Sequence, residues 1–86
     1  MTQPAVVMYA TSWCPYCERA RSLLRSKNVT IEEIDVEASS DKRAEMRLRS
    51  GRRTVPQIFI GDHHVGGSDD LAALEAAGKL DGLLGR

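Results

Sequence analysis

The chain has 86 residues, which is the length of one small domain, so residues 1–86 are expected to form a single unit. Twelve Lys and Arg balance twelve Asp and Glu, and the zero net charge excludes a bulk attraction to nucleic acid or an anionic membrane. The longest apolar run, residues 5–10, is too short for a membrane span or the apolar core of a signal peptide. We therefore expect a cytoplasmic protein with neither a membrane nor a nucleic-acid partner.

The first half of the chain predicts a strand, a helix and a second strand. Residues 5–10 are continuously apolar, which is typical of a strand buried on both faces. Pro15 suits a first helical turn, where its missing N–H needs no partner. An apolar stripe at helical spacing follows, with charged residues expected outside it: the stripe is Cys17, Ala20, Leu23 and Leu24, and the charged residues include Glu18, Arg19, Arg21 and Arg25. Residues 29–37 predict a second strand, parallel to the first, with a right-handed crossover.

The second half predicts a helix, a β-hairpin and a closing helix. Ser39 to Asp41 suit the start of a helix that ends at Gly51, with a thin apolar stripe of Ala44, Met46 and Leu48. Residues 58–60 and 63–65 alternate around a Gly-Asp turn, as in a hairpin. Ser68 is expected to cap the closing helix, which Gly78 ends, and a last apolar turn covers residues 80–84. The order βαβαββα predicts an α/β fold, a mixed four-stranded sheet with helices on both faces.

The stretch TSWCPYCERA, residues 11–20, contains both cysteines of the chain. Structural disulfides are rare in a reducing cytoplasm, so two cysteines this close indicate catalysis or metal binding. Cys14 falls at the predicted helix N-terminus, where unpaired N–H groups and the helix dipole stabilise a thiolate. Cys17 lies one turn inside, where burial keeps its thiol protonated. The pattern predicts Cys14 as the nucleophile and Cys17 as the resolving thiol; two buried structural thiols are the alternative.

Three separate motifs together resemble the dithiol class of the glutaredoxin family: CPYC after the first strand, TVPQIFI at 54–60 and VGGSDD at 65–70. The resemblance implies a thioredoxin-like fold and the reduction of protein disulfides and protein–glutathione mixed disulfides through a Cys14–Cys17 redox-active disulfide. It implies glutathione as a cosubstrate, no bound metal or redox cofactor, and disulfide-containing or glutathionylated proteins as partners. We expect a monomer.

The same resemblance predicts where glutathione binds. It implies a cis Val55–Pro56 bond facing Cys14, so that Thr54, Val55 and Pro56 form one side of the site and the Val55 backbone pairs with the tripeptide. Gly67, Ser68 and Asp69, at a helix N-terminus, suit the carboxylate and ammonium of a γ-glutamyl group. The alternatives are an ordinary turn proline and a plain helix cap with acidic first-turn residues.

Two further residues are candidate ligand contacts, and one expected residue is missing. Tyr16, between the cysteines, is predicted to form a wall of the ligand groove; a core aromatic is the alternative. A basic cluster between Lys42 and Arg53 is most simply a solvated face, and Arg43 is the candidate anchor for the glycine carboxylate of glutathione. Glutaredoxins often carry a lysine three residues before the first cysteine, and Thr11 stands there instead.

A metal-binding module is the rival class of function. Structural zinc needs four ligands, and besides the cysteines only His63 and His64 are imidazole donors. Adjacent residues of a strand point to opposite faces, so both histidines cannot join one tetrahedral site. Two more hypotheses are an iron–sulfur cluster shared by two chains, known among glutaredoxin relatives, and a non-catalytic interaction domain.

Overall fold

The computed structural model describes residues 4–86, and these form one four-stranded sheet with four helices. In chain order the elements are β1 (Val6–Ala10), α1 (Pro15–Ser26), β2 (Ile31–Asp35), α2 (Ser40–Ser50), β3 (Gln57–Ile60), β4 (His63–Gly66), α3 (Ser68–Ala76) and α4 (Leu80–Leu83). The predicted order is confirmed, and the last apolar turn forms a short helix of its own, α4. Residues 1–3 of the expected 1–86 domain lie outside the described part.

The sheet has the order β2-β1-β3-β4. β1 and β2 are parallel, with Val6 opposite Ile31, whereas β3 runs antiparallel to both β1 and β4. The predicted parallel βαβ unit and the hairpin are therefore both present, and the sheet is mixed. Because β1 is central, it is buried along almost its whole length, which explains its continuous apolar sequence.

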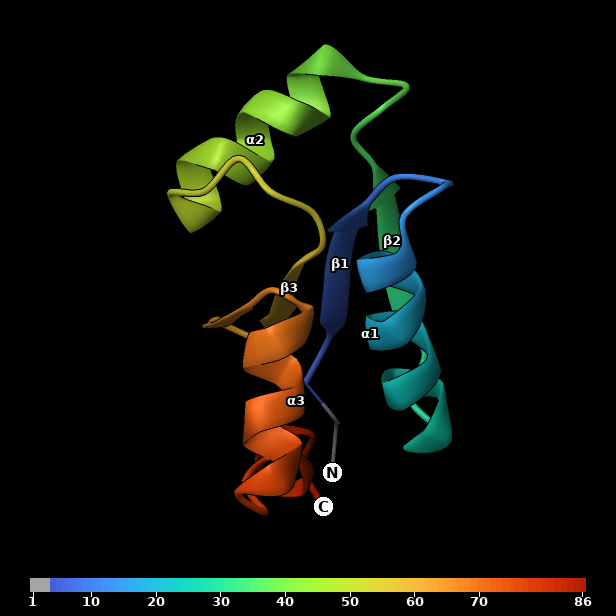
Figure 1. Ribbon diagram of the computed structural model, residues 1–86. Coiled ribbons are helices and arrows are strands. Elements are labelled where there is room, and N and C mark those ends of the chain that lie inside the picture. Colours follow the sequence, from blue (N-terminus) through green and yellow to red (C-terminus); the bar gives the residue numbers. More distant parts are fainter. Residues whose placement is uncertain (1–3) are drawn as a thin grey trace.

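Helices cover both faces of the sheet and give the protein two apolar clusters. α1, α3 and α4 pack on one face around Met8, Leu24, Ile58 and Leu71, all fully buried. α2 lies apart from α1 and α3, beyond the other face of the sheet (Figure 1). There Met46 is the one buried residue of α2, and it packs with Tyr9, Val36 and Phe59.

Two features of the helices differ from expectation: the start of α3 and the burial of Arg21 in α1. Ser68 is the first residue of α3, and Gly67 takes the N-cap position; the Gly67 N–H is satisfied by the Asp70 side chain instead, at 2.8 Å. Arg21, expected outside the α1 stripe, is buried, because its guanidinium pairs with Glu33 on β2 and with Glu18 one turn earlier. Ion pairing satisfies the charge, so the long apolar stem of Arg21 can cover the core.

The expected start of α2, with Ser39 as its N-cap, and its end at Gly51, at φ 71°, are confirmed.

A polar network attaches α2 to the sheet where apolar contacts are few. The Tyr9 hydroxyl donates to Glu45 at 2.5 Å and accepts from Arg49 at 2.8 Å. The Arg49 guanidinium also lies 4.1 Å from the centre of the Phe59 ring, a cation–π contact. With Ala44 and Leu48 exposed, these bonds carry much of the attachment that an apolar stripe would otherwise provide.

We expect Tyr9→Phe to lower the free energy of unfolding by about 1–3 kcal/mol, because it leaves two charged groups without their hydroxyl partner. Chemical denaturation of the wild type and the variant measures the change. Tyr16→Phe is the matched control, because its ring is largely exposed, and it should alter stability by less than about 0.5 kcal/mol. Equal effects of the two substitutions would contradict the role of the Tyr9 hydroxyl in attaching α2.

Candidate active site

The two thiols lie at the start of α1 in different environments. Cys14 is the N-cap residue, with extended backbone, and its sulfur accepts a hydrogen bond from the Cys17 N–H at 3.3 Å. Cys14 is half-buried, Cys17 is fully buried against the core, and neither is in a disulfide. Pro15 occupies the first helical position, as predicted, and this places Cys14 where the free N–H groups of the helix converge.

These environments shift the two pKa values in opposite directions. Burial raises the pKa of the Cys14 thiol, but hydrogen bonds from the Cys17 thiol, from the N–H groups of Cys17 and Tyr16, and from the Thr11 hydroxyl together bring it below its ordinary value. Burial, and then the hydrogen bond with Cys14, raises the pKa of Cys17 to about 11. Cys14 is therefore the thiol that ionises first. The Thr11 hydroxyl, in the position where a lysine was expected, also helps to lower the pKa of Cys14.

A turn from a distant part of the sequence faces Cys14. The Val55–Pro56 peptide bond is cis, as the resemblance implied. The Cys14 sulfur lies 4.0 Å from the Val55 carbonyl oxygen, although 41 residues separate them in sequence. Pro56 is buried directly before β3, so the turn is anchored on one side by the central sheet.

Gln57, which belongs to the TVPQIFI motif but was given no role of its own from the sequence, holds this turn in place. Its fully buried side chain donates from Nε2 to the Thr54 carbonyl at 3.0 Å and to the Thr54 hydroxyl at 3.2 Å. Its Oε1 lies 2.8 Å from Nε2 of His64, whose ring stacks on Phe59. Burial lowers the pKa of His64, which favours the neutral ring as the partner of Gln57. The available sequence signal was a glutamine between the Val-Pro pair and an apolar strand, since a polar side chain that becomes buried there needs hydrogen-bond partners.

A groove of about 470 Å³ opens beside this turn. Its lining residues are Tyr16, Arg52, Arg53, Thr54, Val55, Pro56, Gly67, Ser68, Asp69 and Asp70. The structure thus brings together all the residues predicted from the sequence to contact glutathione except Arg43. Arg43 is half-buried in the first turn of α2, whereas the last turn of that helix leads into the groove, so Arg52 and Arg53 supply the cations there.

The far side of the groove is the N-terminus of α3. Asp70 accepts from the Gly67 N–H at 2.8 Å and from Arg52 at 2.9 Å, and these two bonds lower the pKa of its carboxyl group. Gly66 has φ 112° and a side chain there would collide with the Asp70 carboxylate, so only glycine fits. The Arg52–Asp70 pair joins the two sides of the groove; both residues lie in segments that the sequence analysis noted, but their pairing was not predicted.

The structure also bears on the metal-binding and membrane hypotheses. Within residues 4–86, no three His, Cys, Asp or Glu side chains lie together as a candidate metal site. His63 is exposed, and His64 packs on Phe59. None of the helices in this part of the chain has the length and apolar character needed to cross a membrane.

Comparison with known proteins agrees with this geometry. The sequence profile of the glutaredoxin family matches residues 6–65. The chain belongs to the glutaredoxin family. A glutaredoxin of Pseudomonas aeruginosa is 57% identical over 81 residues, a match that covers 94% of this chain and 96% of that protein.

Solved glutaredoxins share the fold. The solution structure of glutaredoxin from Brucella melitensis superposes with a TM-score of 0.86 at 55% identity, covering 98% of this chain and 91% of that one. A crystal structure of a buckwheat glutaredoxin–glutathione complex has a TM-score of 0.85 at 32% identity, with 95% and 76% covered. The fold is therefore thioredoxin-like, and this glutaredoxin is a glutathione-dependent thiol–disulfide oxidoreductase.

The pKa values can be tested by following the ultraviolet absorbance of the thiolates against pH. We expect two separate steps: one below the pKa of an ordinary cysteine, from Cys14, and one near about 11, from Cys17. The alkylation rate of Cys14 should therefore rise with pH only up to the first step and then level off, since the thiolate is the reactive form.

Thr11→Val should move the first step to higher pH, because a donor to the Cys14 sulfur is lost. Thr30→Val is the control, because this exposed threonine lies outside the site. A first step that stays in place in Thr11→Val would contradict the role of the hydroxyl.

Proposed function

We propose that the chain removes glutathione from protein–glutathione mixed disulfides, and reduces protein disulfides, through Cys14 and Cys17. The observation that carries the proposal is the difference between the two thiols. Cys14, with its pKa lowered, borders the groove through the Val55 turn, while Cys17 stays protonated beneath it. Because its pKa is raised, Cys17 stays a thiol and does not compete with the Cys14 thiolate for the incoming disulfide.

In the first step the Cys14 thiolate attacks the glutathione sulfur of a mixed disulfide. A Cys14–glutathione disulfide forms, and the protein sulfur leaves as a thiolate that takes a proton from solvent. The thiolate of a second glutathione then attacks the glutathione sulfur held on Cys14. Oxidised glutathione leaves, and the Cys14 thiolate is restored, where the helix N–H groups again stabilise it.

Protein disulfides require the second thiol. When Cys14 attacks such a disulfide, a mixed disulfide with the substrate protein forms and one substrate thiolate leaves. Cys17 loses its proton and attacks the Cys14 sulfur, which closes the Cys14–Cys17 disulfide and releases the second substrate thiol. Two glutathione molecules then reduce the enzyme disulfide and leave as oxidised glutathione. The close approach of the two residues, with the Cys17 N–H 3.3 Å from the Cys14 sulfur, suits this ring closure.

The groove offers complementary groups for each part of glutathione. The backbone of Val55 is placed to pair with the tripeptide as an added strand. The free N–H groups of Ser68 and Asp69 suit the γ-glutamyl carboxylate, and the Asp69 side chain suits its ammonium. Tyr16, with its ring exposed, forms a wall. For the glycine carboxylate we propose Arg53 in place of Arg43, because Arg53 lines the groove and Arg43 does not.

We further propose that the enzyme works as a monomer in the cytoplasm.

The redox potential bears on the direction of the proposed reaction. Glutaredoxin potentials of about −200 to −230 mV lie close to the extracted glutathione poise of about −220 to −260 mV. The glutathione ratio therefore sets the direction, and a reducing pool drives the reaction toward free protein thiols.

We expect Cys14→Ser to abolish deglutathionylation of a small glutathione mixed disulfide, because no nucleophile remains. Cys17→Ser should keep more than half of that activity, because the route through Cys14–glutathione does not use Cys17. A glutathione-coupled assay at excess glutathione measures both. Equal loss in the two variants would overturn the assignment of roles.

Asp69→Ala and Asp69→Asn are both expected to raise KM for glutathione by about fivefold, through loss of a charge-assisted hydrogen bond, with a smaller change in kcat. Steady-state kinetics with varied glutathione provide the measurement. Asp62→Ala, in the exposed β3–β4 turn, is the matched control and should leave KM unchanged. If KM for Asp69→Asn equals that of the wild type, Asp69 acts only in stabilising the helix end.

A further inference from the structure

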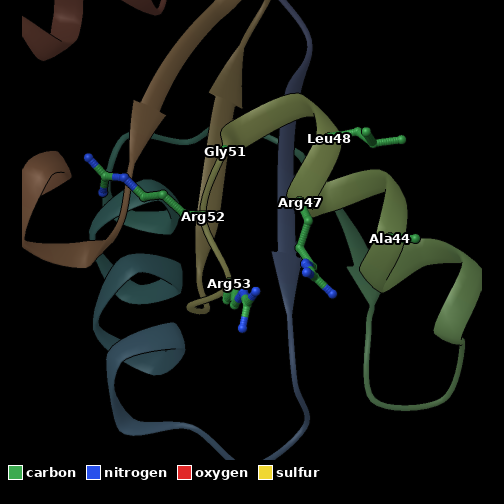
Figure 2. A pocket seen from close by; sticks show the side chains of 6 residues that line it. All are labelled: Ala44, Arg47, Leu48, Gly51, Arg52 and Arg53. Atoms are coloured by element: carbon green, nitrogen blue, oxygen red, sulfur yellow. The ribbon is translucent and has the colours of Figure 1, made fainter.

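A second hollow, separate from the glutathione groove, lies beside the C-terminal half of α2. It has a volume of about 540 Å³. Its lining residues, all labelled in Figure 2, are Ala44, Arg47, Leu48, Gly51, Arg52 and Arg53. We call it the α2 hollow. Arg52 and Arg53 line both it and the groove, so the two hollows adjoin at these residues.

The charge of the α2 hollow is strongly one-sided, although the chain as a whole is neutral. Three of its six lining residues are arginines, and none is acidic. Arg52 pairs with Asp70, but within residues 4–86 no hydrogen bond or ion pair is formed by the side chains of Arg47 and Arg53. Figure 2 shows these two side chains reaching to the same side, one from α2 and one from the loop after it. Two unpaired guanidinium groups lining one hollow suit carboxylates.

An exposed apolar side chain stands beside these charges. Leu48 is 88% exposed and projects outward from α2 in Figure 2. Elsewhere on α2 Met46 faces the core and Glu45 and Arg49 bind Tyr9, so Leu48 has no role in attaching the helix. A leucine at this exposure gains stability only when another molecule covers it.

We propose that the α2 hollow docks an acidic segment of the protein substrate, one that carries Asp or Glu residues together with an apolar side chain. The inference rests on the proposed function, because a mixed disulfide places glutathione in the groove and the protein part outside it. The α2 hollow adjoins the groove at Arg52 and Arg53, so a substrate segment that extends past these residues reaches Arg47 and Leu48. With Arg53 engaged by the glycine carboxylate of glutathione, a carboxylate beside the modified cysteine would pair with the free guanidinium group of Arg47. The hollow therefore selects among glutathionylated proteins without taking part in the chemistry.

The test compares two glutathionylated peptides that differ only in residues flanking the cysteine, Asp, Glu and Leu in one and Ser, Gln and Ala in the other. We expect kcat/KM to be about tenfold higher for the acidic peptide at low salt, and the preference to shrink as ionic strength rises. Arg47→Gln should remove most of the preference, and Leu48→Ala part of it. Arg25→Gln, the same charge change on the exposed face of α1, should leave it intact.

Two further measurements separate this inference from the proposed function. Activity on a small glutathione mixed disulfide without a peptide should be the same in Arg47→Gln and the wild type; its absence in the wild type would overturn the proposed function itself. Binding of the acidic peptide with Ser in place of its cysteine, followed by fluorescence anisotropy, tests docking without any chemistry. Docking is overturned if both peptides react and bind equally, if Arg25→Gln matches Arg47→Gln, or if a single-stranded oligonucleotide binds in an Arg47-dependent way and the acidic peptide does not.

Discussion

The hydrogen bond from the Cys17 N–H to the Cys14 sulfur is the contact on which the rest of the site depends. It makes a thiol the cap of α1, so the group that caps the start of the helix is also the proposed nucleophile. A capping side chain accepts hydrogen bonds from the first turn, and an acceptor that is anionic does so more strongly. The same contact separates the two thiols, because a residue one turn inside a packed helix faces the core. Reactivity and asymmetry thus share one structural cause.

The groove beside the Val55 turn is held by polar bonds that lie behind it. Gln57 fixes the Thr54 end of the turn that carries the cis bond, and His64 in turn holds Gln57. On the opposite side, Asp70 ties the Gly67 N–H to Arg52. Since these bonds engage backbone groups and buried side chains, they position the ligand-facing atoms and leave the free N–H groups of α3 available. The groove is lined by loop residues 52–56 and by the first turns of α1 and α3, and the supporting side chains of Gln57, His64 and Asp70 come from β3, β4 and α3.

α2 has a different relation to the site. It is attached by Met46 and by the Tyr9 network, and it contributes no side chain to the thiol chemistry. Its C-terminal turn leads directly into the loop that lines the groove, and its exposed face carries Arg47 and Leu48. A helix with so little of its surface committed to the core is free to present charge to a partner. The chemistry and the proposed choice of protein substrate would then reside on opposite sides of residues 51–53.

Much of this protein follows from local sequence signals. The order of elements, the start of α1 at CPYC, the cap and end of α2, and the separate roles suggested for Cys14 and Cys17 depend on neighbours in sequence. The resemblance to the glutaredoxin motifs additionally predicted the cis Val55–Pro56 bond and most of the residues that line the groove. Tertiary structure decided the rest, because it depends on residues far apart in the chain. Arg21 is buried through Glu33, Asp70 rather than Ser68 satisfies the start of α3, and Arg53 rather than Arg43 reaches the groove. The long side chains of charged residues find partners only once the strands and helices are placed in space.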